Sequence, residues 1–411
     1  ELAAMSFTFP VTFAIMSIAV GLGIGASAVI ARSIGEGDKE AVRRLTTDAL
    51  LLSNMVVVAV ALLGLAFLDP IFEAMGADED MLPLIRSYMV PWLLGVGLLM
   101  IPMTGNAAIR ATGDTKSPSI IMVTAGGVNA LLDPPLIFGW GPIPAMGLEG
   151  AAYATVISWV ITFVAAFWIL AKREKMLCFD LPRVAEVLDS WRKILYVGLP
   201  AAGTSVVAPV SMALVTRIVA EHGENAVAAF CVGTRIEALA MIGLTSLGAA
   251  LGPFVGQNFG ARQCGRIREA VRFSFAASML YGLGMAVLLA LLAGPLARAF
   301  NDEAAVQGDI VQYLRVVPIS FGLFGFSLLV GSTFNAVNRP LKSAVLVVVR
   351  LGVLAIPLAW AFGRVWGPTG IFAAVSVANL GVGALAWMMV RRFVDRAEAR
   401  FEAEQQPVPA T

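Results

Sequence analysis

Four ionisable side chains lie inside long apolar stretches of this sequence: Asp133, Arg235, Glu237 and Arg350. If those stretches cross a bilayer, each charge costs about 2.5 to 3.5 kcal/mol on insertion scales, and such residues generally face a partner or a water-filled cavity. They are therefore the residues best suited to carry ion or ligand chemistry.

Asp133 has an amide neighbour on its own helical face. Asn129 precedes it by four residues, which brings the two side chains to the same side of a helix. A carboxylate beside a neutral amide oxygen is suited to bind a proton or a small cation. The alternative to ion binding is a structural role, in which Asp133 caps or kinks the helix end before Pro134.

The second pair, Arg235 and Glu237, is two residues apart and cannot form a direct ion pair on a helix. Glu237 is a candidate titratable or cation-attracting group, and Arg235 is a candidate anchor near the membrane edge. A purely structural network is the alternative for both. Arg350 is expected to be structural, because its side chain is close enough to the inner surface to extend to it.

Composition indicates that the elements holding these residues are membrane helices. The chain of 411 residues is 58% hydrophobic and only 14% charged, with a mean hydropathy of +0.83, which excludes a soluble protein of this size. Stretches of about 20 apolar residues span the hydrocarbon core as helices. The sequence predicts an all-α integral membrane protein with eleven spans, at roughly 5–32, 45–68, 83–108, 118–138, 146–170, 194–219, 227–256, 271–293, 314–334, 343–362 and 370–390.

The sequence also contains an internal repeat with a spacing of about 225 residues. Matching pairs are Leu22 and Leu247, Gly35 and Gly260, Lys116 and Lys342, Gly147 and Gly367, and Gly150 and Gly370. The segment 194–219 has no counterpart upstream. We therefore expect two six-helix lobes, with the first helix of the N-terminal lobe missing from this sequence; a genuine eleven-helix protein is the alternative. Duplicated helical halves are typical of secondary transporters.

The expected organisation is an N-terminal transmembrane lobe at 1–171, a cytoplasmic linker at 172–193, a C-terminal lobe at 194–391 and a disordered cytoplasmic tail at 392–411. Lys and Arg residues number 22 in the tail and the loops after odd-numbered spans, against 5 in the other loops. By the positive-inside rule the first set faces the cytoplasm, together with the C-terminus.

Other motifs exclude some functions. The single histidine, His222, cannot form a metal site alone and is expected to be a solvated loop residue. Gly21, Gly23 and Gly25 lie inside an apolar helix, which favours close helix packing over phosphate binding. No P-loop, clustered aspartates or His-Glu metal pattern is present, which disfavours ATP-driven transport and an intramembrane enzyme.

Several segments in order give the chain a family resemblance. They are the run from Gly21 to Gly35, residues 129–134, the stretch from Gly147 to Thr155, the Arg235-Ile236-Glu237 step, and residues 256–261. Together they resemble the multidrug and toxic compound extrusion (MATE) family. The resemblance implies twelve helices in two lobes around a central cavity, and export of amphipathic, often cationic compounds against an inward flow of H⁺ or Na⁺.

The resemblance also implies roles for particular residues. Asn129, Asp133 and Thr155 match an ion-coupling network of the N-terminal lobe, which in the family includes an aspartate on the first helix. Glu237, with Arg235 beside it, matches a position of the C-terminal lobe used for substrate or ion binding.

The expected protein is therefore a cation-coupled antiporter, not an enzyme, that exports small organic compounds by alternating access. No cofactor or metal is expected apart from the coupling H⁺ or Na⁺, and no nucleic acid partner. A monomer in the inner (plasma) membrane is expected. The alternatives are a flippase for a lipid-linked or polysaccharide precursor, disfavoured by having only Arg235 and Arg350 as basic residues at depth, and a non-transporting scaffold.

Overall fold

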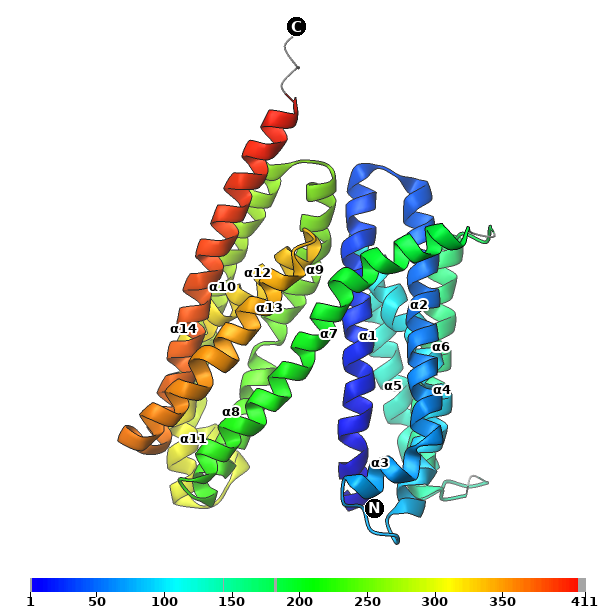
Figure 1. Ribbon diagram of the computed structural model, residues 1–411. Helices are drawn as coiled ribbons and strands as arrows, with labels where there is room; N and C mark the ends of the chain where they lie inside the picture. Colours follow the sequence, from blue (N-terminus) through cyan, green and yellow to red (C-terminus); the bar gives the residue numbers. More distant parts are fainter. Residues whose placement is uncertain (1, 143, 181–182, 406–411) are drawn as a thin grey trace, which may run out of the picture. The chain divides into compact units, whose positions relative to one another are not determined.

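The computed structural model describes residues 2–142, 144–180 and 183–405, and these form helices joined by short turns, without a β-strand (Figure 1). The chain divides into two compact units, Glu1–Gly203 and Thr204–Thr411. The all-helical membrane fold predicted from composition is confirmed.

Unit 1 contains six α-helices, a π-helical turn and the first half of a seventh helix. These are α1 (Leu2–Glu36), α2 (Lys39–Ala66), α3 (Leu68–Ala74), α4 (Leu82–Ala111), α5 (Lys116–Phe138), α6 (Gly147–Trp168), η1 (Ile169–Arg173) and α7 (Val184–Ala220). The unit boundary falls within α7, after Gly203.

Unit 2 contains the rest of α7 and the remaining helices. These are α8 (Glu224–Ala240), α9 (Ile242–Gly260), α10 (Cys264–Phe300), α11 (Ala304–Val316), the 3₁₀ turn η2 (Val317–Ser320), α12 (Phe321–Ala336), α13 (Pro340–Val348), the π-helical η3 (Val349–Ala355) and α14 (Ile356–Gln405).

Each unit is built around one central helix. In unit 1, α4 packs against α1, α2 and α6, and it buries Met89, Met100 and Ile109. In unit 2, α12 packs against α9, α10 and α14, and it buries Phe326 and Phe334. These two helices occupy corresponding positions in the sequence repeat, so each half of the chain has its core on the same element.

Nine helices of the described residues are long and apolar enough to cross a membrane, and the pair α8 and α9, bent by 42°, makes up to ten. One of the nine, Pro340–Ala403, has 64 residues. As a single helix it would be about 96 Å long, three times the hydrocarbon thickness. It is interrupted at Gly367 (φ 61°, ψ −146°), where the chain reverses direction (Figure 1). Counting two spans there agrees with the predicted eleven.

The structure gives no support to the expectation that a first helix is missing. Its α1, helical from Leu2, is the span predicted at 5–32. The repeat itself is visible in the geometry. Gly147 and Gly367 both have positive φ, at 57° and 61°. A Cβ on Gly150 would lie 2.3 Å from the Leu136 carbonyl oxygen, and one on Gly370 would lie 2.2 Å from that of Phe362. Both halves therefore use glycine to pack a helix start against the preceding helix.

The predicted packing role of the α1 glycines is confirmed for Gly21 and Gly25. A Cβ on Gly21 would lie 2.7 Å from the carbonyl oxygen of Gly198, and one on Gly25 would lie 2.4 Å from that of Ile194. The backbones of α1 and α7 therefore approach closely, as small residues permit in membrane helices.

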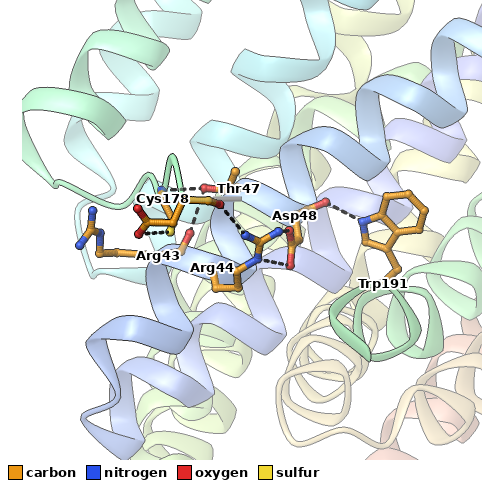
Figure 2. Close-up of polar contacts among 7 residues, drawn as sticks. Arg43, Arg44, Thr47, Asp48, Cys178 and Trp191 are labelled. Carbon is orange, nitrogen blue, oxygen red and sulfur yellow. Dashed lines mark hydrogen bonds and ion pairs between the residues drawn. The ribbon is translucent and has the colours of Figure 1, made fainter. Parts of the chain in front are cut away.

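The predicted linker at 172–193 contains the coil after η1 and the first turns of α7, and it is held against α2 (Figure 2). The backbone N–H of Cys178 donates to the Thr47 hydroxyl (2.9 Å), and Arg43 Nε donates to the Leu177 carbonyl (3.1 Å). These bonds satisfy polar backbone that has no helical partner.

Asp48 makes a further contact between α2 and α7. Asp48 is 0% exposed and forms an ion pair with Arg44, one turn earlier on α2, at 2.5 Å. The indole Nε1 of Trp191 donates to the Asp48 carbonyl oxygen over 3.1 Å (Figure 2). The first turns of α7 are therefore fixed to α2 by the same residue that neutralises Arg44.

The tail expected to be disordered is helical over much of its length. α14 continues through residues 392–405, where Arg268 of α10 forms ion pairs with Asp395 and Glu398. The final residues, 406–411, lie outside the described part of the chain.

Candidate functional site

The predicted ion-coupling residues of unit 1 come from two adjacent helices. Asn129 of α5 donates from Nδ2 to the Thr155 hydroxyl of α6 over 3.4 Å. Thr155 in turn donates to the Ala151 carbonyl oxygen over 3.0 Å, so its oxygen is free to accept the amide. The structure thus brings together two of the three residues.

Asp133 lies one turn beyond Asn129 on α5 and is half-buried. Among the described residues it accepts no hydrogen bond and forms no ion pair, and Tyr88 of α4 is close enough to interact with it electrostatically. An unpaired carboxylate on the same helical face as an amide offers oxygen ligands of the kind that small hard cations and protons bind.

Unit 2 encloses a cavity of about 540 Å³, within the range typical of small-molecule sites. Its walls come from α7, α8, α9, α11, α12, η3 and α14. The polar lining residues are Ser211, Thr234, Glu237, Thr245, Tyr313, Arg350 and Asn379, and the aromatic ones also include Phe230 and Phe324. Glu237, predicted as a site residue, therefore faces a cavity.

Glu237 has a specific partner in this cavity. The phenolic hydroxyl of Tyr313 donates to its carboxylate over 2.6 Å, a short distance expected for a bond to a charged acceptor. Tyr313 is only 1% exposed. A Cβ on Gly233 would lie 2.4 Å from its ring, so that glycine in α8 provides the space into which the ring fits.

Arg350 supplies the positive charge of the cavity. It lies in the π-helical η3, and its guanidinium carbon is 3.6 Å from the centroid of the Phe324 ring, which is a close cation–π contact. It interacts electrostatically with Glu237 and Tyr313. Sequence reasoning expected Arg350 to extend to the membrane surface; the structure places it in the cavity instead. Single-turn π-helical segments often occur at functional sites.

Arg235 is not part of this cavity. It is exposed, and among the described residues it forms no ion pair or hydrogen bond. The two-residue spacing from Glu237 directs the two side chains to different sides of α8, as expected. Its predicted role in substrate or ion binding remains a prediction.

Two cavity residues were missed by sequence reasoning. Tyr313 carries a polar tip like many residues at membrane edges, and no local sequence pattern shows that its ring is buried beside Gly233. Asn379 is 0% exposed, donates to the Ser320 hydroxyl over 2.9 Å, and leaves its amide oxygen without a partner. An amide inside a predicted span was the available signal.

A second hollow lies in unit 1 between α4 and α6, with a volume of about 590 Å³. Its charged groups already have partners: Arg86 pairs with Asp69, and Glu149 accepts from Tyr153 over 2.8 Å. The unit 2 cavity is the better ligand candidate because its charges are less satisfied. Within the described residues, no cluster of three or more His, Cys, Asp or Glu side chains could hold a metal ion.

Comparison with known proteins identifies a family whose sequence model matches this chain. The MatE family model matches residues 1–134 and 200–361. A Shewanella oneidensis protein named FAD transporter is 36% identical over 401 residues, which cover 97% of this chain and 88% of that protein. The probable multidrug resistance protein YoeA of Bacillus subtilis is 26% identical over 362 residues, which cover 87% of this chain and 78% of YoeA.

Solved structures agree with the family match. The crystal structure of the Vibrio cholerae MATE transporter VcmN in the bent form superposes with a TM-score of 0.92 at 28% identity, covering 97% of this chain and 90% of that one.

Proposed function

This chain belongs to the MatE family, and we propose that it exports small organic molecules by antiport against an inward flow of H⁺ or Na⁺. The family match and the names of the relatives make it a multi-pass transport protein rather than an enzyme. The antiport mechanism and its coupling ion are our proposal.

The observation that carries the proposal is the state of Asp133. Its carboxylate has no hydrogen-bonding partner among the described residues, while Asn129, on the same face of α5, is bonded to Thr155 of α6. A proton or Na⁺ arriving at Asp133 would change the charge beside a contact between two helices. In alternating access, that change favours one conformation, and a coupling of about 1 to 3 kcal/mol between the ion and substrate sites is sufficient.

We propose that the transported compounds are amphipathic. The cavity of unit 2 is mostly apolar, with Phe230, Phe324 and Tyr313 in its lining. Drug export is supported by the name of YoeA, a probable multidrug resistance protein.

A second candidate substrate is a flavin dinucleotide. The 36% identity to a protein named FAD transporter over 97% of the chain favours it. This candidate requires a place for anionic phosphates, and Arg350 is the basic group that lines the unit 2 cavity.

We further propose that the protein is a monomer of the inner (plasma) membrane with its C-terminus in the cytoplasm, as the distribution of Lys and Arg predicts. A C-terminal green fluorescent protein fusion should fluoresce, and a C-terminal alkaline phosphatase fusion should be inactive. Active phosphatase would reverse the proposed orientation.

Efflux from cells that lack their own pumps tests the function. Ethidium export and extracellular flavin would be measured for the wild type and for Asp133→Asn, with the proton and sodium gradients collapsed separately. We expect export to stop in Asp133→Asn and on loss of one gradient, while Asp302→Asn, a change in an exposed loop, leaves it unchanged. Normal export by Asp133→Asn would refute the role of Asp133, and absence of any export by well-expressed protein would favour the flippase alternative.

A further inference from the structure

The guanidinium of Arg350 has unused hydrogen-bonding capacity inside a membrane-embedded cavity. An arginine carries five N–H donors. Among residues 2–142, 144–180 and 183–405, none accepts a hydrogen bond from Arg350 or forms an ion pair with it, and its close contact is the face of the Phe324 ring. Phe324 stabilises the charge but accepts no N–H bond in the guanidinium plane. A half-buried cation without acceptors is costly unless something else supplies them.

The nearby carboxylate does not fill this role. Glu237 accepts the short hydrogen bond from Tyr313 and acts on Arg350 only through the electrostatic field. The two charges balance each other, which makes the cavity unfavourable for an additional metal cation at Glu237. The donors of Arg350 remain available to an anion.

A second, independent feature of the cavity is an unpaired acceptor. Asn379 lines the same cavity and is 0% exposed, yet its Oδ1 has no partner. Its Nδ2 bonds to Ser320. Whichever way the amide is turned, the single contact with Ser320 satisfies only one of its two polar atoms. Buried polar groups are nearly always paired with protein atoms or ordered water, so this oxygen is available to accept a hydrogen bond from a ligand.

We propose that the unit 2 cavity binds an organic anion with an aromatic ring system, whose phosphate or carboxylate bonds to Arg350. The ring packs against the apolar and aromatic walls that include Phe230 and Met241, and a polar ring atom contacts Asn379. This inference rests on the proposed export function, and it names the substrate class and its binding residues.

Glu237 has an antagonistic role in this site. Its negative charge repels the ligand's anionic group and competes for Arg350. Removing that charge should strengthen anion binding about tenfold, as expected for like charges several ångströms apart in a partly buried site. The bound anion and Glu237 therefore act as alternative counterions of Arg350.

Two flavins provide a direct test, because riboflavin and flavin mononucleotide share one ring system and differ by a phosphate. Binding to the purified full chain in neutral detergent would be followed by quenching of flavin fluorescence. We expect flavin mononucleotide to bind at least tenfold more tightly than riboflavin. Arg350→Gln should abolish that difference by weakening flavin mononucleotide binding to the level of riboflavin, and Glu237→Gln should increase it.

Arg364 provides the matched control. It also stacks on an aromatic ring, with its guanidinium carbon 4.0 Å from the Trp360 ring centroid, but it is exposed and outside the cavity. Arg364→Gln should retain the preference for flavin mononucleotide. Arg350→Lys, which keeps the charge but loses the planar donors, should retain a reduced preference and shows that the site still folds.

Equal binding of the two flavins by wild-type protein would overturn the proposal, and so would an equal effect of Arg364→Gln. Anionic phosphatidylglycerol is a second source of phosphate; displacement of flavin mononucleotide by low concentrations of this lipid would overturn the assignment to a soluble anion. Ethidium efflux separates failure of this binding site from failure of the proposed export function. Efflux without flavin discrimination refutes only this site, whereas flavin discrimination without transport of any compound refutes the proposed function.

Discussion

Tyr313 and Glu237 are 76 positions apart in the sequence and are joined by a hydrogen bond of 2.6 Å across the unit 2 cavity. The bond connects α11 to α8 and fixes the position of the carboxylate in the cavity wall. Arg350 carries the opposite charge and interacts with Glu237 electrostatically, without an ion pair. The cavity therefore combines one satisfied anion with one unsatisfied cation.

The first prediction concerns that bond. Tyr313→Phe should lower the free energy of unfolding by about 1.5 to 3 kcal/mol, the range for hydrogen bonds to charged groups. Tyr281→Phe is the control, since the Tyr281 hydroxyl bonds to the neutral carbonyl of Ala240 at 2.7 Å and should cost only about 0.5 to 1.5 kcal/mol. Thermal unfolding in detergent measures both. Equal losses would show that the bond to Glu237 stabilises the fold no more than a bond to a neutral acceptor does.

A second prediction concerns the contact between α1 and α7. Gly25→Ala places a Cβ 2.4 Å from the Ile194 carbonyl oxygen, and backbone cannot move aside as a flexible side chain can. The cost should reach about 3 kcal/mol, the upper end for overpacking. Gly126→Ala on α5 meets nothing within 4 Å and should be neutral or stabilise by up to about 1 kcal/mol. Similar melting temperatures for the two variants would contradict the packing described.

The connection between α2 and the linker provides a third prediction. Asp48→Ala removes a fully buried partner of Arg44, and breaking a buried ion pair in this way costs about 3 to 5 kcal/mol. Asp189→Ala breaks the exposed pair with Lys193, another i,i+4 pair, and should cost less than about 1 kcal/mol. Urea unfolding of the purified variants compares them. A small loss in Asp48→Ala would show that this ion pair does not stabilise the fold.

The loop between α4 and α5 gives a pH-dependent prediction. Partial burial alone would raise the pKa of the Asp114 carboxyl, but hydrogen bonds from Ser117 and Lys116 and the Arg173 guanidinium 3.0 Å away hold that pKa below its usual range. A depressed folded-state pKa means that Asp114 stabilises the fold fully above its unfolded pKa of about 3.9, and that this contribution is lost as the pH falls through the folded value.

Asp114→Asn should therefore lower the melting temperature at pH 7, and the difference from wild type should shrink as the pH is lowered below about 4. Asp80→Asn, at an exposed position, should change little at any pH. A difference for Asp114→Asn that persists unchanged into strong acid would mean that the carboxylate charge is not what stabilises this loop.

Much of the fold could be predicted from the sequence because lipid imposes one solution on apolar segments of about 20 residues. The repeat was also predictable, because matching residues such as Gly147 and Gly367 recur in the sequence. Both glycines adopt a positive φ in the structure. Gly367 also marks the break between the two predicted spans 343–362 and 370–390, and α14 is helical on either side of it.

The candidate site was less predictable, because side-chain partners depend on contacts between distant elements. The position of Arg350 within its apolar stretch indicates only its depth, and it gives no information about the ring of Phe324 beside it. His222 was expected to be solvated, yet it is half-buried with Nε2 2.9 Å from the Gly363 carbonyl oxygen. That partner lies 141 positions away, beyond the reach of local patterns.

Gradient-driven transport in proteoliposomes tests the central claim most directly. Purified protein would be reconstituted in vesicles without other transporters, and ethidium movement would be recorded after imposing a pH gradient or a Na⁺ gradient separately. In the wild type, one of the two gradients should drive ethidium against its own gradient, and Asp133→Asn should abolish this movement. Ethidium accumulation by Asp133→Asn at the wild-type rate, or by the wild type without either gradient, would contradict that claim.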